Sequence, residues 1–380
     1  MVTAVEHVDV AVIGAGVIGS ATARALAARG VPAVLLEQFE LGHARGSSHG
    51  ATRIFRLAYP DPGYVAMAVA AGAGWAALQA DAGEELLVRT GGLDAGPGAA
   101  ACAAALAACG VDHAWLDAGE LRDRYPGLAV QPGERMLFQP DAGVSLAGRT
   151  VAAFQRLARR DGVPVRAGTP VRGIEPRRDH VVLRTAGGDI SARVAVLAAG
   201  PWNGNLLRGA VTRPPRLTAT LQQVRYFAPR DRAGGRWPTL IEWPADGVSW
   251  YVVPAAGDAP GVKVASHLPG RAVDPRDGPF AELDPVLEQE AAQYVRRRLP
   301  GLDPAGLAPE TCLYTMTADE DFVLDREGPV VVGGGCSGHA FKFAPLLGEM
   351  LADLALGTQT PVPRERFALS RPALAGPAPG

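Results

Sequence analysis

The stretch Gly14-Ala15-Gly16-Val17-Ile18-Gly19 lies between a short apolar run, Val8 to Ile13, and an alanine-rich segment, Ser20 to Arg29. The first run predicts a buried strand and the second a helix. The three glycines allow a tight turn, close approach of the backbone to a diphosphate, and close packing of the helix. The stretch therefore predicts a βαβ unit that holds a dinucleotide at the N-terminus of the helix.

A carboxylate follows the second strand of this unit. That strand is predicted from Ala33 to Leu36, and Glu37 comes directly after it, eighteen residues beyond Gly19. A carboxylate here can accept hydrogen bonds from a ribose, which favours a free hydroxyl over a 2′-phosphate. These residues indicate a dinucleotide but leave its kind open.

The composition is that of a soluble globular protein. The chain has 380 residues, of which 48% are hydrophobic and 20% charged, enough for two domains. A formal net charge of -2 makes nucleic acid an improbable partner. We expect no membrane span, because no run reaches about 20 uninterrupted apolar residues. Glu6 and Asp9 argue against a signal peptide.

Cysteine usage fits a reducing cytoplasm. The four cysteines, at positions 102, 109, 312 and 336, are too few for a disulfide scaffold, and no CxxC pair indicates a metal site. We expect no bound metal.

The order of predicted elements indicates a discontinuous cofactor domain. Helices are predicted at 66–80, 99–109, 148–160 and 345–356, and buried strands at 194–200 and 330–332. A mixed segment near 215–310 has strand-like runs at 221–227, 249–253 and 262–265. We assign residues 1–80, 145–215 and 311–380 to the cofactor domain, and 81–144 and 216–310 to a substrate-binding domain.

The loop from Ser47 to Arg56 carries three groups that can be positive, His49, Arg53 and Arg56, and no acid. Such a loop is unfavourable unless anions lie nearby, for which a cofactor phosphate, a reduced flavin or a substrate carboxylate are candidates. A solvated basic loop is the alternative.

Near the end of the chain, Thr311-Cys312-Leu313-Tyr314-Thr315 precedes Ser337-Gly338-His339-Ala340-Phe341-Lys342-Phe343. Cys312 is either a buried small hydrophobe or a thiol that bonds a flavin methyl group. Lys342 is either a surface group or a charge at an apolar wall. Lys263 lies four residues before His267, and on the sequence alone it is interpreted as a surface residue.

Over essentially its whole length the chain resembles the monomeric sarcosine oxidase family, with N-methyltryptophan and pipecolate-type oxidases, within the D-amino-acid-oxidase-like flavoproteins. The resemblance rests on GAGVIG at 14–19, SSHGATRIFR at 47–56, AAGPWN at 198–203, CLYTMTADEDFVLD at 312–325 and GCSGHAFKF at 335–343. It implies an α/β (α+β) fold, with a Rossmann-like, GR2-type FAD-binding domain and a second, mainly antiparallel sheet domain.

The resemblance implies FAD, attached covalently through Cys312. The residues expected to bind it are Gly14, Gly16, Val17, Ile18, Gly19, Glu37, Gln38, Ser48, His49, Thr52, Arg53, Val171, Ala199, Gly200, Trp202, Cys312, Gly338, His339 and Lys342.

The resemblance also implies the roles of the reactive residues. Arg56 and Lys342 would bind the carboxylate of an amino acid, and Lys263 would activate oxygen. His49 and Arg53 would favour the reduced flavin by their charge. Further substrate contacts are expected from Tyr251, His267 and Tyr314.

The implied reaction is oxidation of a secondary α-amino acid to an imine, with oxygen reduced to hydrogen peroxide by a monomeric enzyme. Cys336, Ala340 and Ala51 replace residues common in the family, which leaves the substrate open. Alternatives are a cyclic imino acid, as in natural-product biosynthesis, a primary amino acid, or a dehydrogenase. A binding protein that has lost turnover and a nicotinamide enzyme are further alternatives.

Overall fold

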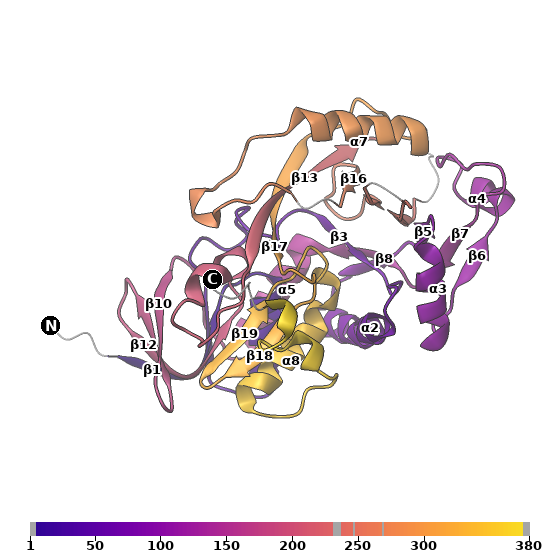
Figure 1. Ribbon diagram of the computed structural model, residues 1–380. Coiled ribbons are helices and arrows are strands. Elements are labelled where there is room, and N and C mark those ends of the chain that lie inside the picture. Colours follow the sequence, from indigo (N-terminus) through magenta and orange to yellow (C-terminus); the bar gives the residue numbers. More distant parts are fainter. Residues whose placement is uncertain (1–4, 231–236, 246–247, 268–269, 375–380) are drawn as a thin grey trace.

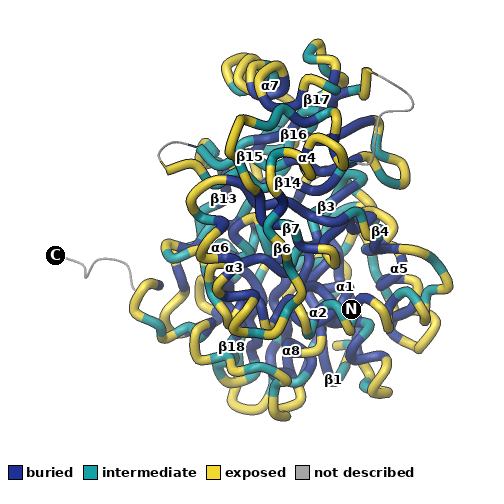
Figure 2. The backbone as a smooth tube through the Cα atoms, turned by 90° about the vertical axis from the view of Figure 1, so that its right-hand side faces the viewer, coloured by how far each residue is buried: buried dark blue, intermediate teal, exposed yellow. Residues whose placement is uncertain are grey.

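The computed structural model describes residues 5–230, 237–245, 248–267 and 270–374. Two large sheets form the framework. In Figure 1 the first lies at the lower left with β1, β10 and β12, and the second runs from β17 and β13 in the centre to β6 at the right. Figure 2 shows buried backbone through the middle of the molecule, with α7 exposed along its outer side.

The first sheet is built on the predicted βαβ unit. Parallel strands follow the order β9-β2-β1-β12-β19, and β18 pairs with β19 in the antiparallel sense. The β10-β11 hairpin pairs with the first half of β12. The bounds are β1 (Glu6–Ile13), β2 (Ala33–Leu36), β9 (Val165–Arg166), β10 (Val171–Pro176), β11 (Val181–Thr185), β12 (Ile190–Leu197), β18 (Val323–Glu327) and β19 (Val330–Gly334).

The helices of this half cover one face of the first sheet. Because side chains alternate along a strand, Val10 and Val12 face the helices, while Ala11 and Ile13 face the β10-β11 side. Helix α1 (Val17–Ala28) packs between α5 (Ala147–Arg160) and α8 (Ala344–Leu356). It begins three residues before the predicted helix, directly after the glycine turn.

The second sheet has eight strands in the order β17-β13-β16-β15-β14-β5-β7-β6. All neighbours are antiparallel except β14 and β5, so the prediction of a mainly antiparallel second sheet is confirmed. The bounds are β5 (Gly92–Ala95), β6 (Ala114–Leu116), β7 (Met136–Gln139), β13 (Thr218–Phe227), β14 (Thr239–Glu242), β15 (Trp250–Val253), β16 (Val262–Ser266) and β17 (Pro309–Met316).

Helix α7 (Pro285–Arg298) was not predicted from the sequence. It covers one face of the second sheet through Ala291, Tyr294 and Val295, which pack in the same core as Val252 and Val264. The remaining elements are α2 (Pro62–Ala82), α3 (Ala99–Ala108), α4 (Ala118–Arg124), α6 (Asn203–Leu206), η1 (Gly200–Trp202), η2 (Pro275–Asp277), η3 (Phe341–Phe343), η4 (Glu365–Phe367) and η5 (Pro372–Leu374).

A third, small sheet links the two halves. Strand β8 (Gly143–Leu146) pairs with both β3 (Thr52–Phe55) and β4 (Leu87–Arg89). These pairings cross the predicted domain boundaries, and the boundary at residue 311 falls inside β17, which pairs with β13. The division into two domains stays a prediction.

Helix α2 is the one helix, among the described residues, that is long and apolar enough to cross a membrane by length and composition alone. The sequence analysis predicted a helix here but no membrane span, because polar residues near its end interrupt the apolar run. Its buried side chains include Tyr64, Val65, Met67 and Trp75, which belong to the main hydrophobic core. Packing in the core accounts for this composition.

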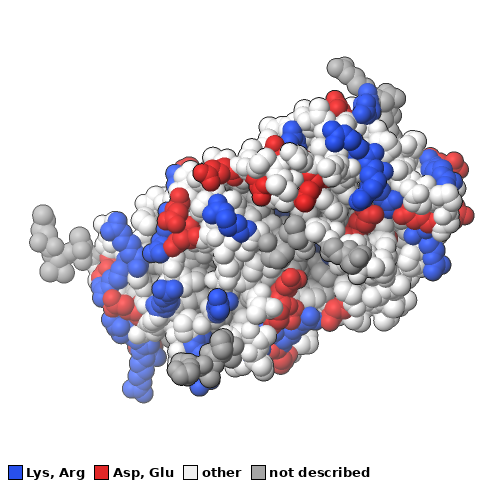
Figure 3. All heavy atoms as spheres, turned by 45° about the horizontal axis from the view of Figure 1, so that its top comes forward, with Lys and Arg blue, Asp and Glu red and all other residues white. Residues whose placement is uncertain are grey.

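Surface charge is mixed. On the face that Figure 3 shows, groups of Lys and Arg are interspersed with groups of Asp and Glu. This distribution matches the nearly balanced composition of 37 basic and 39 acidic residues.

Candidate active site

Two adjoining cavities lie between the sheets. The larger, of about 720 Å³, begins at the glycine turn after β1, and the smaller, of about 380 Å³, lies toward the second sheet. Both volumes are in the range usual for ligand sites. Five residues line both cavities: His49, Arg53, Tyr314, Gly338 and Phe341.

The glycine turn leaves the start of α1 open to the larger cavity. Gly14 has φ +99°, and a Cβ atom there would lie 2.6 Å from the carbonyl oxygen of Ala198. Gly16 is the N-cap and supplies no side-chain hydrogen bond, while Ser48 Oγ accepts from the Val17 N–H at 3.0 Å. N–H groups at an uncapped helix start are suited to phosphate oxygens.

Glu37 lines the larger cavity and also orders the turn. Its carboxylate accepts hydrogen bonds from the N–H groups of Ala15, at 2.9 Å, and Phe39, at 3.1 Å. Burial raises its pKa, but His43 and the two N–H groups outweigh this, so the net pKa is below the usual value. Glu37 is therefore an ionised acceptor beside the turn.

Most of the residues predicted to bind FAD line the larger cavity. Gly19 does not; it packs against Gly14, where an added Cβ would lie 1.9 Å from the Gly14 carbonyl oxygen. Thr52, Cys312, His339 and Lys342 line only the smaller cavity. The predicted residues that line the larger one are Gly14, Gly16, Val17, Ile18, Glu37, Gln38, Ser48, His49, Arg53, Val171, Ala199, Gly200, Trp202 and Gly338.

Two buried polar atoms near the junction of the cavities have no hydrogen-bond partner within the protein, His49 Nδ1 and Thr52 Oγ1. His49 Nε2 lies 2.8 Å from the Thr311 carbonyl oxygen, which assigns the proton to Nε2 and leaves Nδ1 as an acceptor. Burial and then the charge of Arg53 lower the pKa of His49. A polar ligand that reaches from the glycine turn to this junction, as FAD would, fits these atoms.

The basic loop is not solvated. Arg53 donates hydrogen bonds of 2.8 Å to three carbonyl oxygens, those of Thr52, Ser47 and His49. These bonds hold the loop around the guanidinium group and keep a positive charge where the two cavities meet.

Lys263, on β16, is only 4% exposed, so the surface position that the sequence alone favoured is wrong. Its Nζ donates to the Thr52 carbonyl oxygen at 2.9 Å and lies 5.3 Å from the centre of the Tyr226 ring. Burial, followed by the charge of Arg53, lowers its pKa to about 7.

Arg56 and Lys342 both contact Tyr59 in the smaller cavity. Lys342 is 5% exposed, and its Nζ donates to Tyr59 Oη at 2.8 Å and to the His339 carbonyl oxygen at 2.6 Å. Arg56 Cζ lies 4.3 Å from the centre of the Tyr59 ring. Burial, with the Arg56 charge, lowers the pKa of Lys342 well below its usual value. Two cations so close together are suited to a carboxylate.

The opposite wall of the smaller cavity consists of neutral rings. Tyr251 and Tyr314 share a hydrogen bond, and burial raises the pKa of both. The His267 ring lies 5.8 Å from Tyr314, and burial, then Arg56 and Lys342, lower its pKa. These groups are therefore uncharged at neutral pH.

All four cysteines are free. Cys312 lines the smaller cavity, and burial raises the pKa of its thiol although Arg53 and Lys263 act in the opposite direction. Cys336 lines the larger cavity, and burial raises its pKa to about 12.

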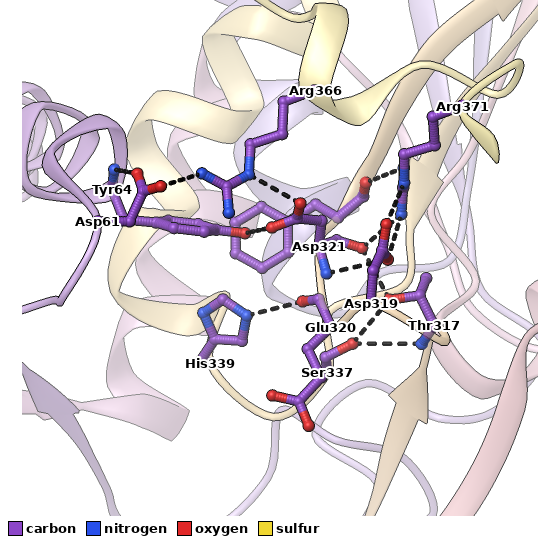
Figure 4. Close-up of polar contacts among 11 residues, drawn as sticks. Asp61, Tyr64, Thr317, Asp319, Glu320, Asp321, Ser337, His339, Arg366 and Arg371 are labelled. Carbon is purple, nitrogen blue, oxygen red and sulfur yellow. Dashed lines mark hydrogen bonds and ion pairs between the residues drawn. The ribbon is translucent and has the colours of Figure 1, made fainter. Parts of the chain in front are cut away.

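A network of ion pairs holds the rim of the smaller cavity (Figure 4). Arg366 contacts Asp61 and Asp321, each at 2.7 Å, and Tyr64 Oη donates to Asp321 at 2.8 Å. His339 Nε2 lies 3.0 Å from the Glu320 carbonyl oxygen. The C-terminal segment around η4 is thus attached to the start of α2 and to the loop before β18.

The sequence analysis missed several residues of the smaller cavity. Asp94, which lies behind the cavity lining, was also missed, although an acid within the buried strand β5 is a signal that the sequence offers. The others depend on contacts between distant segments: Tyr59, Tyr64, Trp243, Trp250, Glu310 and Arg366. Across the described parts of the chain, no group of three or more His, Cys, Asp or Glu is placed to hold a metal ion.

Comparison with known proteins gives one family. The family model described as FAD dependent oxidoreductase (DAO) matches residues 9–354. Monomeric sarcosine oxidase of Bacillus sp. (strain NS-129) is 32% identical, covering 97% of this chain and 98% of the relative. Peroxisomal sarcosine oxidase of Homo sapiens is 35% identical over 96% of both chains. N-methyl-L-tryptophan oxidase of Salmonella newport (strain SL254) is 31% identical over 96% of this chain and 98% of the relative.

Solved structures show the same fold. NikD, an unusual amino acid oxidase essential for nikkomycin biosynthesis, matches in its open form with a TM-score of 0.85 and 27% identity, over 96% of this chain and 97% of that chain. L-proline dehydrogenase from P. horikoshii matches with a TM-score of 0.83 and 20% identity, over 96% and 97%.

Proposed function

Because the chain belongs to the FAD-dependent oxidoreductase family, we propose that it oxidises the C–N bond of a secondary α-amino acid, N-methyl or cyclic, to an imine. Oxygen is the final electron acceptor and becomes hydrogen peroxide. The observation that carries the proposal is the pair of cations, Arg56 and Lys342, around Tyr59 in a cavity that adjoins the larger one.

FAD, when bound, supplies the acceptor for two electrons from the substrate. Arg56 and Lys342 bind the substrate carboxylate and so fix the position of the carbon that is oxidised. The neutral wall of Tyr251, His267 and Tyr314 disfavours an ammonium ion, so the amine binds in its neutral form. No strong general base is then required.

Lys263 acts in the oxidative half of the reaction. Its Nζ is buried beside the junction of the cavities, where it stabilises the negative charge that develops as oxygen takes up electrons. Lowering of its pKa to about 7 makes this stabilisation dependent on pH.

Cys312 is the proposed point of covalent attachment. Its sulfur would hold FAD through a thioether to a flavin methyl carbon, a linkage that would replace the S–H and C–H bonds and release two electrons to oxygen. Arg53 and Lys263 support the thiolate that this bond requires, although burial opposes it.

A cyclic imino acid is the second candidate substrate. The smaller cavity, of about 380 Å³, has aromatic walls that include Trp243, Trp250 and Tyr251, and such walls suit a ring. Turnover as a dehydrogenase, or on a primary amino acid, is a further variant that oxygen uptake and substrate titration distinguish. We also propose that the protein is a monomer, is located in the cytoplasm and binds no metal.

The test is an anaerobic titration of the purified protein, followed at the visible flavin maximum. The panel contains sarcosine, other N-methyl amino acids, pipecolate, proline and primary amino acids. Bleaching by a secondary amino acid, with peroxide formed when air is admitted, supports the proposal. Bleaching by primary amino acids alone contradicts it. A colourless protein that does not turn yellow when FAD is added contradicts the assignment of FAD as the cofactor.

A further inference from the structure

A buried carboxyl group lies behind the carboxylate-binding cations. Asp94, on β5, is 3% exposed, and its Oδ1 accepts a hydrogen bond of 2.8 Å from Trp243 Nε1. The same oxygen lies 3.7 Å from Arg56 Nη1. Burial raises the pKa of Asp94 and outweighs Arg56 and Trp243, which act in the opposite direction, so the net pKa lies above its usual value. Burial of an ionised carboxyl group costs free energy unless the group is paired, so this arrangement requires an explanation.

Asp94 acts through two residues that line the smaller cavity, although it does not line the cavity itself. Arg56 Cζ lies 5.2 Å from the Trp243 ring, so the guanidinium group is placed against both Trp243 and Tyr59. The backbone N–H of Trp243 donates to the Ala95 carbonyl oxygen at 2.8 Å. Asp94 therefore fixes a cation and a wall of the cavity together.

The second consequence of Asp94 is a change in the net charge around Tyr59. Arg56 and Lys342, when Lys342 is protonated, place two positive charges around Tyr59, and Asp94, when ionised beside Arg56, reduces the net charge to one. Lys263, toward the cofactor side, interacts electrostatically with Glu310 instead. At the rim, Arg366 is paired with Asp61 and Asp321, and Arg371 is paired with Asp319, so these side chains offer no free cation to a ligand.

We propose that Asp94 is a specificity-determining positioning residue, which makes the cavity select substrates with one carboxylate over substrates with two. A single carboxylate neutralises the one net charge around Tyr59. A second carboxylate beside Tyr59 in the same low-dielectric cavity is repelled by Asp94, and the remaining cations of the cavity, Arg53 and Lys263, lie away from it on the cofactor side. This inference rests on the proposed function, because it takes the smaller cavity as the substrate site.

The test compares the binding of acetate and malonate to the FAD-loaded protein, measured from changes in the flavin absorbance. The wild-type protein is expected to bind acetate more tightly than malonate. Asp94→Asn keeps an acceptor for Trp243 but removes the charge, and should shift the ratio of the two dissociation constants about tenfold toward malonate. Asp94→Glu, which keeps the charge, and Trp243→Phe, which removes the N–H donor and reduces the ring but changes no charge, should keep the wild-type preference.

Three results would overturn the inference. The first is an unchanged ratio in Asp94→Asn, and the second is a wild-type protein that prefers malonate. The second can be measured even if Asp94→Asn does not fold. A shift of the same size in Trp243→Phe would also overturn it, because the effect would then come from the wall and not from the charge. Neither probe requires turnover, so a protein that no amine reduces would defeat the proposed function while the binding ratios still test Asp94.

Discussion

The ammonium group of Lys263 donates a hydrogen bond of 2.9 Å to the backbone carbonyl of Thr52. This bond connects β16 of the second sheet to β3 of the small linking sheet. It holds the lysine at a fixed position relative to the loop that carries His49 and Arg53, at the junction of the two cavities. The bond also uses one of the three donors of the ammonium group.

Replacement of Lys263 by Met should slow oxidation of the reduced protein about 10²-fold, because the charge that stabilises reduced oxygen is lost. Reduction by substrate should change far less. Rapid-mixing measurements of the two half-reactions check this, with Lys263→Arg as the control that keeps a positive charge. Equal slowing of both half-reactions would show that the lysine only supports the fold.

The oxygen reaction should depend on pH. The pKa of Lys263 is lowered to about 7, so the charged form predominates below that pH and the neutral form above it. The rate of oxidation by oxygen should therefore fall as the pH rises through about 7. The rate in Lys263→Met should lack this step; a step of the same size in the variant would assign it to another group.

Substitution of Gly338 by Ala should destabilise the protein by about 2–4 kcal/mol. Gly338 has φ +77°, and an added Cβ would lie 2.4 Å from the Tyr314 ring. Gly328→Ala is the matched control, since Gly328 has φ +56° with nothing within 4 Å and should lose only about 1 kcal/mol. Urea unfolding of the two variants measures the difference, and equal losses would rule out the contact with Tyr314.

Replacement of Cys312 by Ser should release the flavin on denaturation. Acid precipitation of the wild-type protein should leave the yellow colour in the pellet, whereas the variant should leave it in the supernatant. Cys336→Ser, at a cysteine that lines the larger cavity, is the control and should behave as the wild type. Flavin that stays in the pellet of Cys312→Ser would defeat the proposed linkage.

Local patterns were enough to predict much of the fold. The glycine turn, the strand before it and Glu37 after β2 depend on residues close together in the chain, and β1, α1 and β2 were placed within a few residues. Helix α7 was missed because most of its residues are charged or polar, and its three buried apolar side chains form only a weak pattern. The pairing of β17 with β13 was missed because no local pattern records a partner about 90 residues away.

The sequence by itself determined the dinucleotide-binding turn. Its resemblance to a family indicated that the cofactor is a flavin and which residues are candidates for the site. Only the tertiary structure decided that Lys263 and Lys342 are buried, because burial depends on segments that the chain brings in from elsewhere. It also decided that Asp94 lies behind Arg56: Arg56 directly follows β3, Asp94 lies in β5, and α2 separates them in the chain. Charge balance within a cavity arises from the packing of distant segments, which no motif encodes.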